Sequence, residues 1–311
     1  MNRGKVLKPG DTIALTAPAS PLSRDELTRV ISILESLGFN LKIGESCVQK
    51  YGGYLAGTAK ERAEELESFF VDPSVQAIVC LRGGYGSMQL LNLLDYELIG
   101  ENPKLFVGYS DITALHLAFL QKANLATIHG PMAATDLARG MPKTSWSYFW
   151  KLLTVAKPLG ELENPSAEEL ICIVPGKAEG TLVGGNLSIL SATMGTPYEL
   201  DTEGKILFLE DIGEEPYKID RMFTQLALAG KFAACSGIIL GTWTNCTSAR
   251  YPDSFTVLEL AREIIAPYGK PTLYNLQAGH GRINLPLPLG VKATLDATNK
   301  RLVIEERVAD D

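Results

Sequence analysis

The sequence is poor in the residue types that most often hold metals or form disulfides. Among 311 residues there are three histidines and five cysteines, and the cysteines are far apart, odd in number and without a CxxC pair. A zinc site or a disulfide framework requires these residues at close, regular spacing. The sequence therefore indicates free thiols in a reducing compartment and no metal site.

The chain also lacks a basic excess and a long apolar run. Its formal net charge is -7, which argues against a nucleic-acid partner because neutralising phosphates requires clustered Lys and Arg. No apolar stretch approaches the length of a membrane span. Pro9, Gly10 and Asp11 interrupt the only segment that resembles a secretory signal. We expect a soluble, cytoplasmic protein that binds small molecules or peptides and no membrane.

Short β-branched runs alternate with helical patterns in the first part of the chain. Ser23 with Glu26, and Thr58 with Glu61, have the spacing of capping boxes and predict the starts of two helices. Strands that alternate with capped helices predict a mostly parallel sheet, whose ligands bind at the carboxyl ends of the strands. The expected strands are 12–18, 40–45, 77–82, 104–109 and 125–130.

The pattern changes after residue 155, where prolines, glycines and glutamates gather as they do in linkers. We predict an N-terminal α/β domain at 1–155, a linker at 156–178 and a second domain at 179–311. The last two apolar runs are separated by the turn residues 298–300 and predict a hairpin, so the second domain is expected to be mixed α/β. Its other expected strands are 179–185, 205–210, 237–243 and 271–276.

The stretch LFVGYSDIT (105–113) places Ser110 at the tip of a strand-to-helix turn. A serine there projects from the carboxyl edge of the sheet, and the free amide of Asp111 at the helix start could hold an oxyanion. Serine is, however, also a favoured helix cap, and Ile112 occupies the position where the nucleophile elbow of α/β hydrolases has glycine. Both interpretations, nucleophile and cap, stay open at this point.

A glycine-rich loop, RGGYGS (82–87), follows the expected strand 77–82. Its glycines let the backbone approach a ligand closely, and Arg82 could hold a carboxylate or a phosphate. The loop lacks the Lys of a phosphate-binding P-loop and the GxGxxG spacing of a dinucleotide site. An ordinary tight turn between strand and helix explains the loop equally well.

A serine nucleophile requires a base and an orienting acid. Of the three histidines, His280 between two glycines ranks first as the base, His129 at a strand end ranks second, and His116 lies within a helix. Glu210 ends a strongly apolar strand, where a carboxylate needs a partner, although an acid in this place is often only a helix cap. Ser110, Glu210 and His280 occur in the chain order that α/β hydrolases use.

Taken together, the motifs resemble the LD-carboxypeptidases of peptidase family S66, of the muramoyltetrapeptide carboxypeptidase type. They run in order over nearly the whole chain, and the set is far more specific than any single motif. The matching pieces are LRGGYGS (81–87), VGYSDITALH (107–116), HGPM (129–132), GGNLSIL (184–190), ILFLEDIGEEPYKIDRMFTQL (206–226), GHG (279–281) and LPLG (287–290).

This resemblance implies a fold and a set of site residues. The fold would be a flavodoxin-like N-terminal α/β domain with a parallel sheet, followed by a smaller C-terminal mixed β/α domain of the swivelling type. The catalytic triad would consist of Ser110 as nucleophile, Glu210 as acid and His280 as base, split across the two domains. The oxyanion donors would be the amides of Asp111 and Gly84. Family members are cytoplasmic, metal-free and commonly dimeric, so a homodimer without a cofactor is expected.

The reaction that the resemblance implies is hydrolysis of the L,D bond to the terminal D-Ala of a murein tetrapeptide during wall recycling. We expect the substrate to bind at Arg82, Gly83 and Tyr85, with Arg82 or the loop amides holding its free carboxylate. Two alternatives stay open. One is a microcin-immunity hydrolase of peptide-nucleotide toxins, which the Arg-Gly-Gly-Tyr-Gly form of the loop disfavours. The other is a non-catalytic module that binds a peptide or a sugar.

Overall fold

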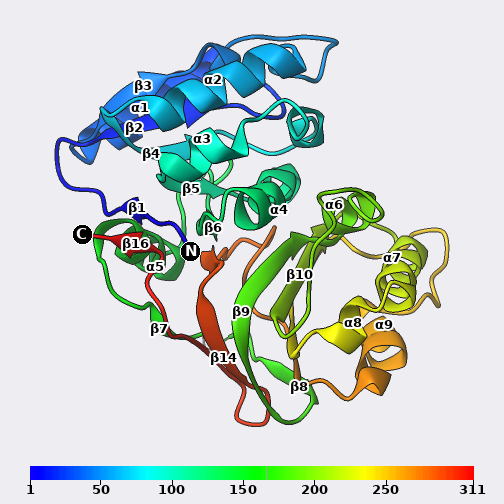
Figure 1. Cartoon of the computed structure of the whole chain (residues 1–311). Coiled ribbons are helices and arrows are strands. Elements are labelled where there is room, and N and C mark those ends of the chain that lie inside the picture. The colour runs from blue at the N-terminus through cyan, green and yellow to red at the C-terminus, as the bar shows by residue number, and fades with distance from the viewer. Residues whose placement is uncertain (166) are drawn as a thin grey trace. The chain divides into compact units, whose positions relative to one another are not determined.

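The computed structural model describes residues 1–165 and 167–311, which form two compact units (Figure 1). The N-terminal unit is made of Met1–Lys157, Leu285–Gly290 and Arg307–Asp311. The C-terminal unit is made of Pro158–Asn284 and Val291–Glu306. The sequence prediction gave all of 179–311 to the second domain, whereas in the structure two short segments of this stretch pair with strands of the first unit.

The N-terminal unit is built on a six-stranded sheet of order β13-β6-β5-β4-β2-β3. The five strands from the first half of the chain are parallel, and β13 pairs antiparallel with β6 at the edge. The order β3-β2-β4-β5-β6 is that of flavodoxin-like folds, in which the winding direction reverses between β2 and β4. This confirms the predicted fold of the unit. The strands are β2 (Thr12–Thr16), β3 (Asn40–Ile43), β4 (Val75–Cys80), β5 (Leu105–Gly108), β6 (Thr127–His129) and β13 (Leu287–Leu289), beside a separate pair of β1 (Gly4–Lys5) and β16 (Ala309–Asp310).

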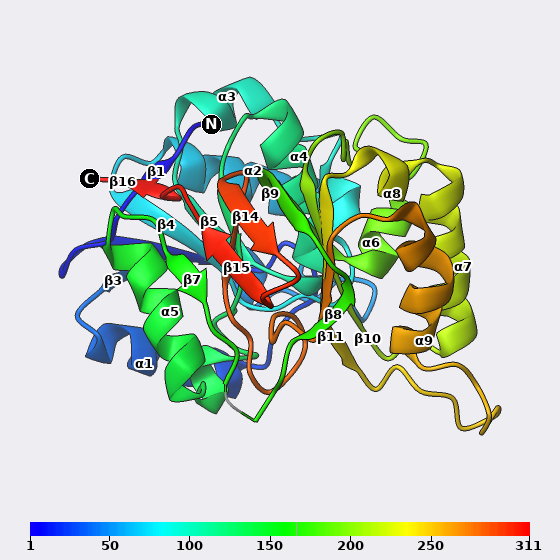
Figure 2. The same ribbon diagram turned by 90° about the horizontal axis from the view of Figure 1, so that it is seen from below.

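Helices cover both faces of this sheet. Helices α2, α3 and α4 lie side by side on one face, and α1 and α5 lie on the other (Figure 2). Both predicted capping boxes are present at the starts of α1 and α2. The helices are α1 (Arg24–Ser36), α2 (Ala59–Val71), α3 (Tyr96–Glu101), α4 (Thr113–Lys122) and α5 (Lys143–Thr154), with short 3-10 turns η1 (Glu45–Cys47), η2 (Ser87–Leu90), η3 (Ser110–Ile112) and η4 (Leu137–Arg139).

The C-terminal unit has an eight-stranded mixed sheet of order β7-β15-β14-β9-β10-β11-β12-β8. The four neighbouring strands β9 to β12 are parallel, and the predicted terminal hairpin is present as β14 and β15. Helices α6 to α9 lie together on one side of this sheet (Figures 1 and 2). The strands are β7 (Gly160–Leu162), β8 (Ile171–Val174), β9 (Lys177–Asn186), β10 (Ile206–Ile212), β11 (Gly237–Thr244), β12 (Thr272–Tyr274), β14 (Lys292–Asp296) and β15 (Arg301–Ile304).

The helices of this unit are short, except for one. They are α6 (Leu187–Ala192), α7 (Pro216–Leu228), α8 (Lys231–Ala234) and α9 (Val257–Leu260), the last continuing into a π-helical turn at Ala261–Ile265 and a 3-10 turn at Ala266–Tyr268. In the part of the chain that the structure describes, none of the helices has the length and apolarity needed to cross a bilayer.

The stretch 156–178, predicted as a linker, contains β7, β8 and the beginning of β9. Strands β7 and β8 occupy the two edges of the C-terminal sheet, so each has a single neighbour. Short edge strands tolerate charged residues and nearby prolines, which protect an exposed edge from pairing with another chain. The composition of these edge strands therefore resembles that of a linker, although the residues form part of the sheet.

His116 belongs to the core of the N-terminal unit, where it joins β5 to β6. It lies on α4 and is buried, and its Nε2 is 2.8 Å from the carbonyl oxygen of Gly108. Its Nδ1 is 2.8 Å from the hydroxyl of Thr127. Because a carbonyl can only accept, Nε2 carries the proton and Nδ1 accepts from Thr127. Burial lowers the pKa of His116 from 6.5 to about 4, which keeps the ring neutral.

The stability of the protein should fall as the pH is lowered from 6.5 to 4. In this range His116 binds a proton in the unfolded chain but stays neutral in the folded protein. The pKa difference corresponds to a loss of roughly 3 kcal/mol in the free energy of unfolding. Urea unfolding at pH 7 and pH 4.5 measures this loss. The variant His116→Gln, whose amide does not titrate, should lose less stability between the two pH values. An equal loss in both proteins would contradict this assignment.

Candidate active site

Ser110 occupies the turn between β5 and α4 with a strained backbone. Its φ is 64°, in the left-handed region that residues other than glycine seldom adopt. The N-cap of the short η3 turn is Tyr109, whose backbone is extended as caps require. Ser110 is therefore not the helix cap, and strain of this kind is concentrated at functional sites.

Close packing at this turn is possible because the strand residue Gly108 has no side chain. A Cβ atom added to Gly108 would lie 2.7 Å from Cγ2 of Ile112, nearer than real side-chain contacts allow. Gly108, two residues before the serine, thus makes room for the branched side chain two residues after it. Ile112, which stands where α/β hydrolases have a second glycine, therefore packs against the main chain of Gly108.

The glycine-rich loop lies against this serine. A Cβ atom on Gly83 would be 2.8 Å from Cβ of Ser110 and 3.3 Å from the amide nitrogen of Asp111. Gly84 has a φ of 111°, and a Cβ atom there would be 2.3 Å from Oγ of Ser20, in the loop after β2. Three loops, which follow β2, β4 and β5, therefore meet at the carboxyl edge of the sheet, as parallel topology predicts.

Two backbone amides at this edge are available as hydrogen-bond donors. The amide of Asp111 is in the first turn of its helix, where no intrahelical acceptor exists. The amide of Gly84 donates to no other group within the described residues. Amides beside a serine hydroxyl can stabilise an oxyanion when that serine attacks a carbonyl group.

Arg82 and Tyr85 flank the glycines of the loop. Arg82 lies two residues after the end of β4, is partly buried and forms no ion pair within the described residues. Hydrogen bonds from Ser23 lower the pKa of Glu26, and the charges of Arg82 and Arg139 lower it further. The guanidinium of Arg82 thus lies near the start of α1. The side chain of Tyr85 is about half exposed, and its ring is 5.9 Å from that of Tyr54.

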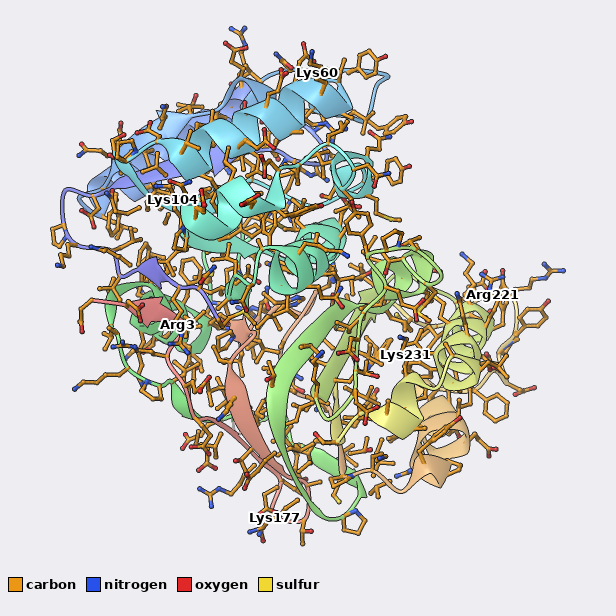
Figure 3. The ribbon with its side chains drawn as sticks, viewed as in Figure 1. Arg3, Lys60, Lys104, Lys177, Arg221 and Lys231 are labelled. Carbon is orange, nitrogen blue, oxygen red and sulfur yellow. The ribbon has the colours of Figure 1, made fainter. Side chains whose placement is uncertain are left out.

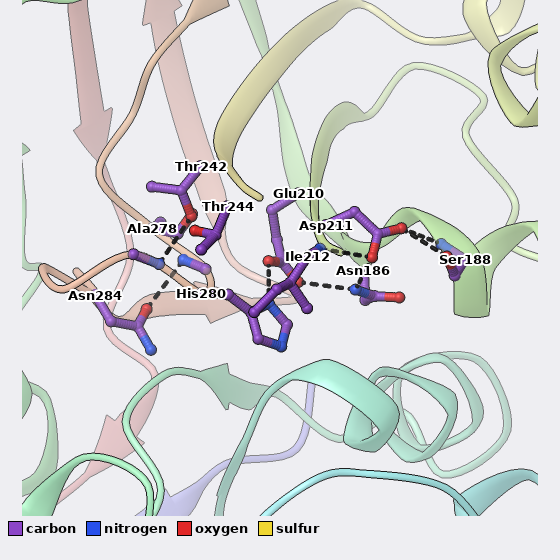
Figure 4. Close-up of polar contacts among 12 residues, drawn as sticks. Asn186, Ser188, Glu210, Asp211, Ile212, Thr242, Thr244, Ala278, His280 and Asn284 are labelled. Carbon is purple, nitrogen blue, oxygen red and sulfur yellow. Dashed lines mark hydrogen bonds and ion pairs between the residues drawn. The ribbon is translucent and has the colours of Figure 1, made fainter. Parts of the chain in front are cut away.

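The C-terminal unit holds the predicted acid and base as a hydrogen-bonded pair. Nδ1 of His280 is 2.6 Å from Oε2 of Glu210, in the second half of β10 (Figure 4). The side chain of Glu210 is fully buried and that of His280 is 11% exposed. Burial raises the pKa of Glu210, and the charge of His280 opposes this effect. With Nδ1 donating to the carboxylate, Nε2 is the basic nitrogen of the neutral ring.

The loop that carries His280 is fixed from several sides. Gly279 has a φ of 117°, and a Cβ atom there would lie 2.4 Å from Oε2 of Glu210, so a side chain would displace the carboxylate. The amide of Gly279 donates to Oδ1 of Asn284 at 3.1 Å. Thr242 accepts from the amide of Gly281 at 3.2 Å and donates to the carbonyl of Ala278 at 3.1 Å (Figure 4).

Asn186, at the end of β9, is a neighbour of the pair that sequence reasoning missed. Its Nδ2 donates to Asp211 at 2.9 Å and, more weakly, to Glu210 at 3.4 Å. Asp211 in turn accepts from the amide and the hydroxyl of Ser188 at 2.9 and 2.7 Å, so it supports the start of α6. The motif GGNLS (184–188) carried the signal, because an Asn after two glycines at a strand end is a typical helix cap.

His129, ranked second as a base, lies in the interior of the N-terminal unit. It is fully buried on β6, and its ring is 5.8 Å from that of Tyr109 and 6.4 Å from that of His116. The structure therefore brings together Glu210 with His280 in one unit. It brings together Ser110, Asp111 and the glycine loop in the other.

Comparison with known proteins agrees with this division. The family model described as the LD-carboxypeptidase N-terminal domain matches residues 13–130, and the one described as the LD-carboxypeptidase C-terminal domain matches residues 179–295. A probable murein peptide carboxypeptidase of Bacillus subtilis is 41% identical over 308 residues, which cover 98% of this chain and 95% of that protein.

Solved structures of similar proteins share the fold over nearly the whole chain. The microcin C7 self immunity protein MccF superposes with a TM-score of 0.91 at 28% identity and covers 100% of both chains. The muramoyltetrapeptide carboxypeptidase from Oxalobacter formigenes superposes with a TM-score of 0.82 at 29% identity, over 95% of this chain and 99% of that one. The chain therefore belongs to the LD-carboxypeptidase family of peptidases and is a hydrolase.

Proposed function

We propose that the protein is a serine carboxypeptidase that hydrolyses the L,D bond to the terminal D-Ala of murein tetrapeptides. The observation that carries this proposal is the buried pair of Glu210 and His280, whose atoms are 2.6 Å apart. Removing a carboxylate from water costs free energy unless it is paired with another group. A histidine held through Nδ1 by such a carboxylate is the general base of serine hydrolases. The murein peptide named for the Bacillus subtilis relative supports the substrate.

In the proposed reaction, Ser110 is the nucleophile and His280 its base. Nε2 of His280 takes the hydroxyl proton of Ser110 while Oγ attacks the carbonyl carbon of the L,D bond. The amides of Asp111 and Gly84 stabilise the oxyanion that forms. The C–N bond then breaks, and D-Ala leaves with the proton from His280. A water molecule deprotonated by His280 finally attacks the acyl-enzyme, the bond to Oγ breaks, and His280 returns the proton to Ser110 as the shortened peptide leaves.

The carboxylate of the terminal D-Ala is proposed to bind Arg82, beside the backbone of Gly83 and the ring of Tyr85. Arg82 is a cation without an ion pair in the described part of the chain, and it directly precedes the glycine that faces Ser110. A guanidinium group matches a carboxylate in geometry and charge. An exopeptidase requires such a contact, because it must distinguish a free chain end from an internal bond.

A second candidate function is hydrolysis of a peptide-nucleotide toxin. The observation that favours it is the TM-score of 0.91 with MccF, named as a microcin C7 self immunity protein. Both candidates use the same serine chemistry and differ in the group that leaves. A non-catalytic binding module, the third possibility, would release no product from either substrate.

Replacement of the nucleophile should abolish the reaction. We expect the wild type to release D-Ala from a murein tetrapeptide, and Ser110→Ala to lower the rate by at least about 10³-fold. Free D-Ala is measured with a D-amino-acid oxidase assay, and a peptide-nucleotide substrate is tested in parallel. Release from the nucleotide substrate alone would favour the second candidate. Release from neither substrate would favour the binding module.

The carboxylate of Glu210 should act mainly on kcat. In Glu210→Gln the amide no longer holds the imidazole in the required tautomer or stabilises its charged form, so kcat should fall by about 10²–10⁴-fold while KM changes little. The matched control is Glu214→Gln, which removes a nearby carboxylate that pairs with Lys218. Equal effects of the two substitutions would show that Glu210 does not orient the base.

Loss of Arg82 should weaken binding of the terminal carboxylate of the substrate. We expect Arg82→Ala to raise KM by about 10-fold or more, because a charge-assisted hydrogen bond contributes about 1.5–3 kcal/mol. Arg139→Ala is the control, since this exposed arginine also acts on Glu26 but lies outside the glycine-rich loop. An unchanged KM and kcat in Arg82→Ala would remove Arg82 from the proposed site.

A further inference from the structure

A buried arginine on α2 contacts the loops around Ser110 without being part of the proposed triad. Arg62 is fully buried. Its guanidinium donates to the carbonyls of Gly57 at 3.2 Å, of Gly86 at 2.9 Å and of Pro18, and to Oε1 of Gln89 at 2.7 Å. Within the described residues it forms no ion pair. Burying a cation in this way is costly, and an apolar side chain would often stabilise a fold equally well.

The carbonyl groups that Arg62 binds come from separate loops at the carboxyl edge of the sheet. Pro18 is in the loop after β2, Gly57 precedes α2, and Gly86 ends the glycine-rich loop after β4. The loop after β2 contacts the loop after β4 directly, because the amide of Tyr85 donates to Ser20. Arg62 therefore connects the segments that surround Gly84.

One peptide unit is held from both sides by charged groups. The carbonyl of Gly86 and the amide of Ser87 belong to the same peptide bond. Nη1 of Arg62 donates to its oxygen at 2.9 Å, and Oδ2 of Asp111 accepts from its N–H at 2.8 Å. Asp111 follows Ser110 in the chain. The end of the glycine-rich loop is thus anchored, through this peptide unit, to the turn that carries the serine.

The backbone at this point leaves no room for a side chain. Gly86 has a φ of 132°, and a Cβ atom there would lie 2.8 Å from Nη1 of Arg62. The guanidinium therefore lies directly against the main chain of the loop. Burial lowers the pKa of Arg62, and the charge of Asp111 acts in the opposite direction, which favours the charged form of the arginine.

We propose that Arg62 is a positioning residue for catalysis. By fixing the peptide unit between Gly86 and Ser87, it sets the amides of the glycine-rich loop at the distance from Ser110 that an oxyanion requires. The inference rests on the proposed function, in which the amide of Gly84 is an oxyanion donor. Arg62 acts through the loop and does not touch the substrate.

The test compares Arg62 with a second buried cation of the same unit. Lys104 is nearly as buried, and its Nζ donates to the carbonyls of Asp72 at 2.8 Å and Val75 at 2.6 Å, beside the amino end of β4. Figure 3 shows Lys104 and Lys60, two residues before Arg62, toward opposite ends of this unit. Lys104 precedes β5 and Ser110 follows it, so Lys104→Met removes a buried cation and its carbonyl contacts at the sheet edge opposite the serine.

Three measurements are made on the full-length wild type, Arg62→Met, Arg62→Lys and Lys104→Met. They are the rate constant for reaction of Ser110 with a fluorophosphonate, kcat and KM for D-Ala release, and the melting temperature. We expect Arg62→Met to lower kcat and the fluorophosphonate rate by about 10–100-fold with KM nearly unchanged, because oxyanion contacts act in the transition state. Lys104→Met should lower the melting temperature but keep both rates within about twofold.

Rates of Arg62→Met within about twofold of wild type, or a loss no larger than that of Lys104→Met, would overturn the proposal. If Arg62→Met does not fold, Arg62→Lys decides, since a single ammonium group cannot reach all four acceptors; unchanged rates would then overturn it. A wild type that does not react at Ser110 would contradict the proposed function and this inference together. A wild type that reacts there but releases no D-Ala would contradict the substrate alone, and the fluorophosphonate rates would still decide on Arg62.

Discussion

A carboxylate cut off from water must be compensated by its neighbours, and this constraint shapes the centre of the C-terminal unit. Glu210 is fully buried in the second half of β10, where an isolated charge would be strongly destabilising. His280 supplies the principal hydrogen bond and Asn186 a weaker one. The absence of a side chain at Gly279 leaves the space that the carboxylate occupies. A glycine at position 279 is therefore required by the carboxylate of Glu210 as well as by the loop that carries His280.

The N-terminal unit also buries charged groups, in this case two of opposite sign. Arg62 and Asp111 are both buried, and among the interactions of the described residues they form no direct ion pair. Each forms a hydrogen bond with the same peptide unit instead, Arg62 with its oxygen and Asp111 with its N–H. Peptide groups carry a large dipole, so a cation at the oxygen and an anion at the N–H are both favourable. Such an arrangement gives a glycine-rich loop a fixed conformation despite the flexibility of its sequence.

Features encoded by neighbouring residues could be predicted from the sequence, and those that depend on distant contacts could not. The capping box of Ser23 and the strand end before Ser110 are local, and the structure has them where they were expected, whereas β10 continues two residues past Glu210. Arg62 could not be found, because it stands in a charged stretch of α2, KERAEE (60–65), that is typical of a solvent-facing helix. It is buried by contacts with residues that are distant in the sequence, such as Pro18. The edge strands in 156–178 were missed for the same reason, since their pairing partners follow about 100 residues later or more.

The return of β13 and β16 to the N-terminal unit has a consequence for how the chain is made. The segment Leu285–Gly290 covers the edge of β6, and Arg307–Asp311 supplies the partner of β1. During synthesis on the ribosome, the first 157 residues leave the exit tunnel with one sheet edge uncovered, and an open edge is a site for wrong pairing. The first unit to be translated is therefore among the last to be completed, and a gene fragment that ends at the apparent domain boundary would encode an unfinished sheet.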